Sequence, residues 1–206
     1  MPAVVDMSTL ASRFPQVTER PSGDCPAFNV PASVLVDALR FLRDECGFDL
    51  LTDITGIDWG LEASPRFGVI YHLVTTKTYD TIRIVTECSA TEPPTVPSAT
   101  AVWPAADWHE REAYDFFGIR FEGHPDLRRI LMWDSYPHHP LRKDFPLAGI
   151  ETPLPDAEIQ AETGTKVMPA PMAGGPFVAP QQDHVSKREP RARDESWNEQ
   201  KPKPDA

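Results

Sequence analysis

The apolar residues recur with two periods up to about Gly149, one typical of helices and one typical of strands. The helical period is clearest in residues 33–46, where Ser33 has the position of an N-cap and Gly47 that of a helix C-terminal glycine. The apolar stripe of this predicted helix consists of Val34, Leu35, Ala38, Leu39, Phe41 and Leu42. A shorter helix is predicted at residues 7–14.

Four stretches have the composition of β-strands, because they are rich in β-branched and aromatic residues or alternate polar with apolar positions. They are residues 27–30, 48–54, 66–75 and 81–87. The short connection at residues 77–80 predicts that the last two form an antiparallel hairpin. Residues 55–60 are expected to form a turn, and residues 93–97 a proline-rich loop.

A third helix is predicted to begin at Pro104 or Ala105 and to end near Phe117, with Gly118 as its stop. The R-R-I-L run at residues 128–131 is expected to be a further strand. Together these elements favour an α+β fold of two layers. In this fold a mixed or antiparallel sheet is covered by helices on one side, and an extended C-terminal tail follows.

The composition changes beyond Ile150, where Pro, Glu and Ala dominate. Prolines in runs such as M-P-A-P-M-A-G-G-P interrupt both helices and paired strands. Apolar residues are too sparse there for burial to offset the entropy of ordering. We therefore predict an α+β domain at residues 1–149 and an extended or disordered tail at residues 150–206.

The overall composition excludes several classes of protein. With 206 residues, 40% hydrophobic and 25% charged, the chain is long enough for one globular core. Its net charge of -11 argues against nucleic-acid binding and direct membrane binding, because both need a basic face. No apolar run reaches the roughly 20 residues of a membrane-spanning helix, and the N-terminus lacks the pattern of a secretory signal. We expect a cytoplasmic protein that reaches a membrane only through a partner.

The cysteines point to no redox or metal chemistry. Cys25, Cys46 and Cys88 lie far apart and form no C-x-x-C motif. Three scattered thiols make neither a disulfide framework nor a site for an iron–sulfur cluster. The glycine-rich motifs that bind dinucleotides or nucleotide phosphates are also missing.

Charged and aromatic residues are interleaved most densely in residues 108–146. On a helix, Arg111 and Asp115 are four residues apart and can pair, and Asp115 shares a face with Trp108 and Glu112. A partly desolvated carboxylate needs a cation. The available cations are Arg128, Arg129, Arg142 and Lys143. We expect a charge-paired junction between this helix and the R-R-I-L run, the alternative being a solvated helix face with weak pairs.

A metal site is a second interpretation of the same block. His109 and Glu112 are three residues apart on the predicted helix, a spacing that allows both to bind one metal ion. Further ligands would be His124, His138 and His139. The zinc motif H-E-x-x-H is absent, since position 113 is Ala.

Two catalytic interpretations are weaker. Ser135 and Cys88 lack a nucleophile-elbow motif, which argues against a hydrolase. Glu112, Asp115 and His124 can be read as general acid–base groups. Structural pairing is the simpler account, because several cations lie in the same block, and His124, which precedes a proline, is expected to fix a turn.

Several runs in this order resemble the 30 kDa (C) subunit of the respiratory NADH:quinone oxidoreductase (complex I). They are Glu110-Arg111-Glu112, Tyr114-Asp115 with Phe117-Gly118-Ile119, the stretch from Phe121 to Leu131, the block P-L-R-K-D-F-P from Pro140 to Pro146, and the upstream run from Gly47 to Asp58. The chain departs from the family at His138-His139, where a Gly is usual shortly before P-L-R-K-D.

The resemblance implies a structural subunit of the peripheral arm of this proton-translocating enzyme, with no cofactor or catalytic residue of its own. It implies that NADH, FMN, iron–sulfur clusters and quinone are bound by partner subunits. The implied partners are the quinone-site (D) subunit, the iron–sulfur (B and I) subunits and other members of the complex, at the cytoplasmic face of the inner membrane. The residues that we expect to form a subunit interface or a structural charge network are Glu110, Arg111, Glu112, Asp115, His124, Arg128, Arg129, Arg142, Lys143 and Asp144.

The sequence is compatible with two other classes of protein. Energy-converting hydrogenases and quinone- or deazaflavin-linked dehydrogenases use similar scaffold subunits, so the electron donor can differ. A stand-alone binding module is the third class, and it would purify as a stable monomer.

Overall fold

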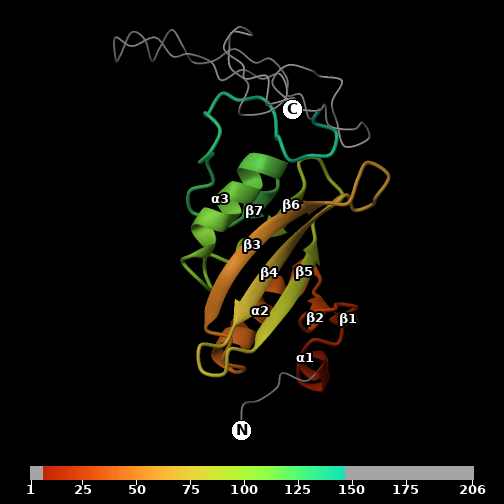
Figure 1. The fold of residues 1–206 in the computed structure, drawn as a ribbon, viewed down its shortest axis with the longest axis vertical. Helices are drawn as coiled ribbons and strands as arrows, with labels where there is room; N and C mark the ends of the chain where they lie inside the picture. Colours follow the sequence, from red (N-terminus) through yellow and green to blue (C-terminus); the bar gives the residue numbers. More distant parts are fainter. Residues whose placement is uncertain (1–6, 147–206) are drawn as a thin grey trace, which may run out of the picture. The chain divides into compact units, whose positions relative to one another are not determined.

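The computed structural model describes residues 7–146 (Figure 1). The elements are α1 (Met7–Arg13), β1 (Thr18–Arg20), β2 (Ala27–Asn29), the 3-10 turn η1 (Ala32–Val34), α2 (Leu35–Asp44), β3 (Leu50–Asp58), β4 (Phe67–Val74), β5 (Thr81–Glu87), β6 (Thr95–Pro97), α3 (Ala106–Phe117) and β7 (Arg120–Glu122). All belong to one compact unit, which also includes Leu141–Lys143, whereas residues 135–140 and 144–146 belong to another. The predicted tail at 150–206 lies outside the described residues. Within them, no helix is both long and apolar enough to cross a membrane.

Five strands form a mixed sheet in the order β1-β2-β5-β4-β3. β2 runs parallel to β5, and the other neighbours are antiparallel, which confirms the predicted hairpin as β4 and β5. Phe28, Ile84, Tyr71 and Ile54 are paired across four strands and are all 2% exposed or less. Because side chains alternate along a strand, this row marks the face of the sheet that carries the core.

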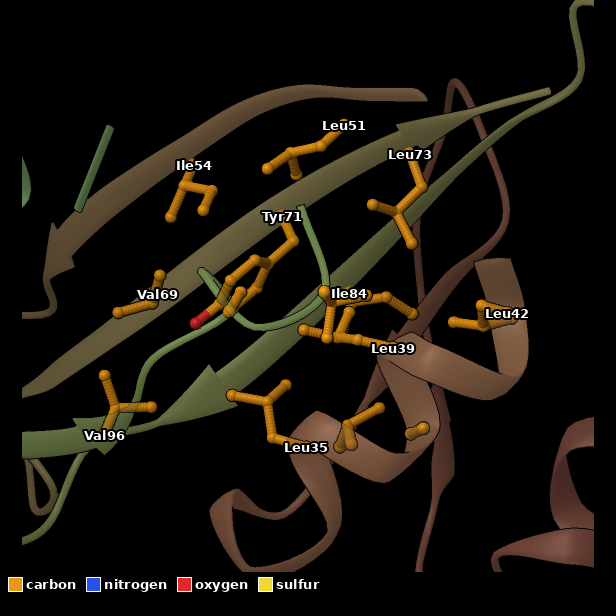
Figure 2. Close-up of a cluster of buried hydrophobic side chains, with 14 of the residues drawn as sticks. Leu35, Leu39, Leu42, Leu51, Ile54, Val69, Tyr71, Leu73, Ile84 and Val96 are labelled. Atoms are coloured by element: carbon orange, nitrogen blue, oxygen red, sulfur yellow. The ribbon is translucent and has the colours of Figure 1, made fainter. Parts of the chain in front are cut away.

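Helix α2 covers this face with the apolar stripe predicted from the sequence. Leu35, Leu39 and Leu42 are fully buried and point toward the sheet face that contains Tyr71 and Ile84 (Figure 2). Full burial of one such leucine stabilises the fold by about 1.5–3 kcal/mol. The predicted helix therefore forms because its stripe matches the core face.

The ends of α2 match the prediction only in part. Ser33 lies inside η1, and no side-chain cap bonds either this turn or α2, so the predicted N-cap is wrong. The 3-10 turn leads directly into the helix, with the N–H of Leu35 donating to the carbonyl of Ala32. At the other end, Gly47 has a φ of 80°, as expected for a helix-terminating glycine.

Helix α3 packs against the edge strand β3 on the same face (Figure 1). A Cβ atom on Gly56 would lie 2.5 Å from Cδ2 of Phe117, so the ring occupies the space of a side chain there. Gly56 is two residues from Ile54 and thus faces the core. Residues 55–58 continue β3, and the turn predicted at residues 55–60 is wrong over them. With α2 and α3 on one face, the predicted α+β architecture is confirmed.

Three short strands, β1, β6 and β7, were not predicted from the sequence. β6 and β7 form a parallel pair in which Val96 lies opposite Phe121, and both are buried. The loop predicted at 93–97 is therefore wrong over β6. The strand predicted at 128–131 is also wrong, because the N–H groups of Ile130 and Leu131 donate to the carboxylate of Asp115 and not to another strand.

Candidate structural site: the charge network of helix α3

Helix α3 carries three buried charged residues, which is unusual for a helix of a small domain. Glu110 and Asp115 have no exposed area, and Arg111 is 4% exposed. The helix ends at Gly118, whose φ of 74° places it in the left-handed region and whose N–H donates to the carbonyl of Tyr114. Each of the three buried groups must therefore find its partners within the fold.

The carboxylate of Asp115 binds a loop. Nη1 of Arg129 lies 2.6 Å from Oδ1, and the N–H groups of Ile130, Leu131 and Met132 donate to Oδ2 at 2.7–3.0 Å. Successive N–H groups around one oxygen make an anion-binding nest. Burial acts to raise the pKa of Asp115, but these donors outweigh it and hold the pKa below its ordinary value.

Arg111 fixes the preceding residues of the same loop. Its Nε donates to the carbonyl of Arg128 at 3.2 Å and its Nη2 to the carbonyl of Arg129 at 3.5 Å. Its guanidinium stacks on the ring of Trp108, with the Cζ 4.9 Å from the centroid. One side of α3 therefore holds residues 128–132 in two ways. Arg111 donates to the carbonyls of residues 128 and 129, and Asp115 accepts the N–H groups of residues 130–132.

Glu110 faces the turn that precedes α3. Its Oε1 accepts the N–H of Ala99 at 2.6 Å, and its Oε2 accepts the hydroxyl of Ser98 at 2.7 Å. Desolvation outweighs these two bonds and raises the pKa of Glu110 to about 7. The ring of His124 is also fully buried, and its Nε2 lies 4.0 Å from Oε2 of Glu110.

His124 joins α3 to the turn after β7. Its Nδ1 accepts the N–H of Asp126 at 3.0 Å, so in the neutral ring the proton sits on Nε2. Nε2 lies 3.2 Å from Oδ1 of Asp107. His124 therefore stabilises the turn that was predicted at this residue.

A third buried carboxylate, that of Asp58, lies at the end of β3. Arg66 donates to both oxygens of Asp58, at 2.9 and 2.6 Å, and the N–H groups of Gly60 and Lys143 add two more bonds. Burial alone would raise the pKa of Asp58, but the donors bring it to about 2. Asp58 thereby fixes the segment Leu141–Lys143 against the sheet.

Arg142 fixes the same segment from its other side. Its Nε donates to the carbonyl of Phe117 at 2.7 Å, its Nη2 to Glu92 at 3.1 Å, and its Cζ lies 4.9 Å from the centroid of the Phe67 ring. The backbone N–H of Leu141 donates to the carbonyl of Phe116. Hydrogen bonds thus hold the segment Leu141–Lys143 at the end of α3.

The pairing within the predicted network differs from the expected one. Asp115 pairs with Arg129 and not with Arg111, whose acidic neighbour is Asp107 at 3.9 Å. Trp108 and Glu112 are exposed whereas Asp115 is buried, so these three do not share one environment.

The remaining predicted residues have peripheral roles. Arg128 forms an exposed pair with Asp126. Lys143 contributes its backbone N–H to Asp58, and Asp144 is exposed.

Asp58, Arg66 and Ser98 also belong to the network, although they were not predicted from the sequence. A signal for Asp58 was present, because it closes the run from Gly47 to Asp58. Arg66 and Ser98 had no such signal, since only the fold brings them to their carboxylates.

The structure gives no geometry for the alternative metal site within residues 7–146, where no three His, Cys, Asp or Glu side chains are arranged to hold an ion. His109 points to Asp53, with Nδ1 and Oδ1 3.9 Å apart, while Glu112 is exposed. His138 packs against the rings of Tyr136 and Phe145.

The fold and the network define an α+β protein whose buried charges shape its own loops. The model of the family described as "Respiratory-chain NADH dehydrogenase, 30 Kd subunit" matches residues 28–151. The chain belongs to this family. The NADH-quinone oxidoreductase C 2 subunit of Rhizobium meliloti (strain 1021) is 51% identical over 130 residues, which cover 62% of this chain and 70% of that protein. The NADH-quinone oxidoreductase C subunit of Phenylobacterium zucineum (strain HLK1) is 43% identical over 150 residues, 73% of this chain and 70% of that protein.

A solved structure shows the same fold. A chain in the structure of the membrane-bound sulfane sulfur reductase, an archaeal respiratory membrane complex, matches with a TM-score of 0.58 and 25% identity. The match covers 77% of this chain and 89% of that chain.

Proposed function

We propose that the chain is a structural subunit of the peripheral arm of a proton-translocating NADH:quinone oxidoreductase, in contact with the subunit that holds the quinone site. Family membership supports the enzyme, and the charge network supports the role. The observation that carries the role is that Asp115, Arg129 and Arg142 bind the chain's own loops. Groups used in this way shape a surface and are not available to a substrate.

The surface that these bonds shape has a composition suited to protein contact. Trp108 on α3, and Leu131 and Leu141 in the two segments bonded to that helix, are 63%, 55% and 53% exposed. Leu131 is fixed by Asp115, and Leu141 by the carbonyl of Phe116. Exposed large apolar side chains on a rigid support favour a partner protein. We call these three residues the contact surface and assign it to the quinone-site (D) subunit, with the iron–sulfur (B and I) subunits nearby in the arm.

In this proposal the chain holds no redox centre, and NADH, FMN, iron–sulfur clusters and quinone are bound by other subunits. The cysteine content supports this, since Cys25, Cys46 and Cys88 form no C-x-x-C motif and an iron–sulfur cluster usually takes four thiolates. The chain would lie at the cytoplasmic face of the inner membrane, held there by its partners. The absorption spectrum of the purified chain tests the first point, and a visible band from a bound cofactor would contradict it.

Co-purification from the host organism tests the assembly. A tagged chain should recover the NADH-binding and quinone-site subunits. Trp108→Gln and Leu131→Gln should lower this recovery about tenfold, a hot-spot effect. Leu61→Gln, which removes an apolar side chain that is 64% exposed on another loop, is the control. Equal recovery with all three variants would contradict the assigned surface.

The likeness to a chain of the sulfane sulfur reductase complex supports a second candidate, a scaffold of a related hydrogenase-type or deazaflavin-linked assembly. The same co-purification separates the two. A large subunit with a nickel-ligating cysteine pattern, recovered without NADH-binding subunits, would favour this second candidate.

A further inference from the structure

Tyr79, the last residue but one of the connection between β4 and β5, combines a strained backbone conformation with an exposed side chain. Its φ is 62°, in the left-handed region that suits glycine and asparagine and strains a bulky side chain. The same side chain is 80% exposed. Among residues 7–146, Tyr79 is the one non-glycine residue with a positive φ.

The hairpin holds this conformation through several bonds. The N–H of Tyr79 donates to the carbonyl of Thr75 at 2.9 Å, and the N–H of Thr75 donates to the carbonyl of Asp80 at 3.0 Å. Asp49, just before β3, accepts both the N–H and the hydroxyl of Thr76, at 2.8 and 2.6 Å. These bonds fix the backbone of the tip, and with it the direction of the Cα–Cβ bond of Tyr79.

The isolated chain gains nothing from a tyrosine here. A ring that is 80% exposed buries little apolar area, and Gly or Asn would adopt this φ with less strain. Strain that is held in place by surrounding bonds points to a functional constraint. We infer that Tyr79 is a contact residue that inserts into a pocket on a second subunit of the same complex, an inference that rests on the proposed function.

The chemistry of the tip defines the kind of pocket. The ring fits apolar walls and the hydroxyl fits a hydrogen-bond acceptor, the combination that makes tyrosine frequent at protein interfaces. Asp80 follows Tyr79 in the chain, Asp49 binds Thr76 of the same connection, and Lys77 is the cation of this connection. Bonds from Thr76 lower the pKa of Asp49 and keep it ionised. The acidic rim fits a partner surface with excess positive charge and disfavours anionic lipid.

This contact is separate from the one at Leu141. Val74 pairs with Leu50 at one end of the β3–β4 ladder, and Asp58, which binds the N–H of Lys143, pairs at the other end. The hairpin tip in Figure 1 lies at the first of these ends. A partner that engages Tyr79 thus meets the opposite end of the sheet.

Three variants of the full chain separate contact from stability, each tagged and expressed in a host strain that lacks the native chain. Tyr79→Asn removes the ring and relieves the strain, so recovery of partner subunits should fall about tenfold. The midpoint of thermal unfolding should stay the same or rise by about 2–4 °C. Tyr79→Ala removes the ring and keeps the strain, so recovery should fall equally with no rise in midpoint. Lys77→Asn, on the same tip, keeps the ring, so it should leave the thermal midpoint unchanged and should not lower recovery.

The outcomes are distinguishable. If Tyr79→Asn recovers as much of the partner subunits as wild type does, the inference is wrong. It is also wrong if recovery falls only in variants whose midpoint of thermal unfolding falls, whether or not they keep the ring. Binding of the same variants to anionic vesicles is measured as well. If the Tyr79 variants recover partner subunits normally but no longer bind the vesicles, the ring contacts a membrane and the inference is wrong. A wild-type chain that recovers no partner subunits overturns the proposed function itself.

Discussion

The carboxylate of Asp115 lies 2.6 Å from Nη1 of Arg129, fourteen residues further along the chain. The other oxygen of the same carboxylate accepts three successive N–H groups, from Ile130 to Met132. One acid on α3 therefore determines the course of four consecutive loop residues. The same bonds fix the backbone of Leu131, whose side chain is exposed to solvent.

Asp115→Asn should destabilise the protein strongly. An amide cannot accept from Arg129 on one side and from three N–H groups on the other, so donors are left unpaired in a buried site. We expect the free energy of unfolding to fall by about 3 kcal/mol, measured by urea denaturation. Glu112→Gln, exposed on the same helix, should change it by less than about 0.5 kcal/mol. Equal stability of the two variants would contradict the role of Asp115.

Asp58 should make stability depend on pH in the acid range. Its pKa is about 2 in the folded protein, below the ordinary value of 3.8. The unfolded chain therefore binds more protons between these values, so the stabilisation is present above about pH 4 and lost as the pH falls towards 2. The difference amounts to about 2 kcal/mol.

Urea denaturation at pH 2.5 to 6 measures the effect of Asp58. Asp58→Asn should be less stable than wild type at pH 6 and should show a flatter profile. Asp37→Asn is the control, because the pair of Asp37 with Arg40 is exposed. A wild-type profile in the Asp58→Asn variant would disprove the assignment.

The helices could be predicted because their signals are local. The stripe of α2 and the terminal glycines Gly47 and Gly118 are properties of short windows of sequence. Helix α3 ends directly before Gly118, whereas α2 ends at Asp44, three residues before Gly47. Strands β4 and β5 were found for the same reason, since a short connection and β-branched residues define a hairpin.

The missed features depend on contacts between distant residues. β6 and β7 are short, and they pair only because the fold places Val96 beside Phe121. Gly56 was interpreted as a turn glycine, although it is needed for the close approach of Phe117. The R-R-I-L run has the composition of a strand, but its N–H groups bind Asp115.

The candidate site was predicted as a block but not as a set of pairs. Interleaved charges and aromatics indicated the correct segment, because buried charges need partners. Asp115 pairs with Arg129 and not with Arg111 because the loop folds back over α3. The spacing of residues along the helix does not predict this fold of the loop. The same reasoning explains why Arg66 was missed.

Gly56→Ala should separate α3 from β3. The added methyl would lie 2.5 Å from the Phe117 ring, so the ring or the helix must move. We expect a loss of about 1–3 kcal/mol in the free energy of unfolding, typical of overpacking in a core. Gly23→Ala, where nothing lies within 4 Å of the added atom, is the matched control. If both variants unfold at the same urea concentration, the close approach does not exist.

Ionisation of Glu110 should lower the free energy of unfolding as the pH rises through the neutral range. In the folded protein its pKa is about 7, whereas the ordinary value is 4.5. Between these values the folded state binds more protons than the unfolded chain, so the free energy of unfolding falls as the pH rises, by on the order of 3 kcal/mol in total. Glu110→Gln resembles the protonated form, because its carbonyl can accept from Ala99 and its amide can donate to Ser98.

Urea denaturation of wild type and Glu110→Gln at pH 4.5, 6 and 7.5 tests this expectation. The free energy of unfolding of the variant should fall less with rising pH than that of wild type. At pH 7.5 the variant should be at least as stable as wild type. Subtracting the two profiles isolates Glu110 from the nearby groups His124 and Asp107, which both proteins share. Glu112→Gln should follow wild type, because that side chain is exposed one half-turn away on the same helix. Parallel profiles for wild type and Glu110→Gln would mean that the buried carboxyl is ionised throughout this range, with its charge balanced by the donors of Ser98 and Ala99.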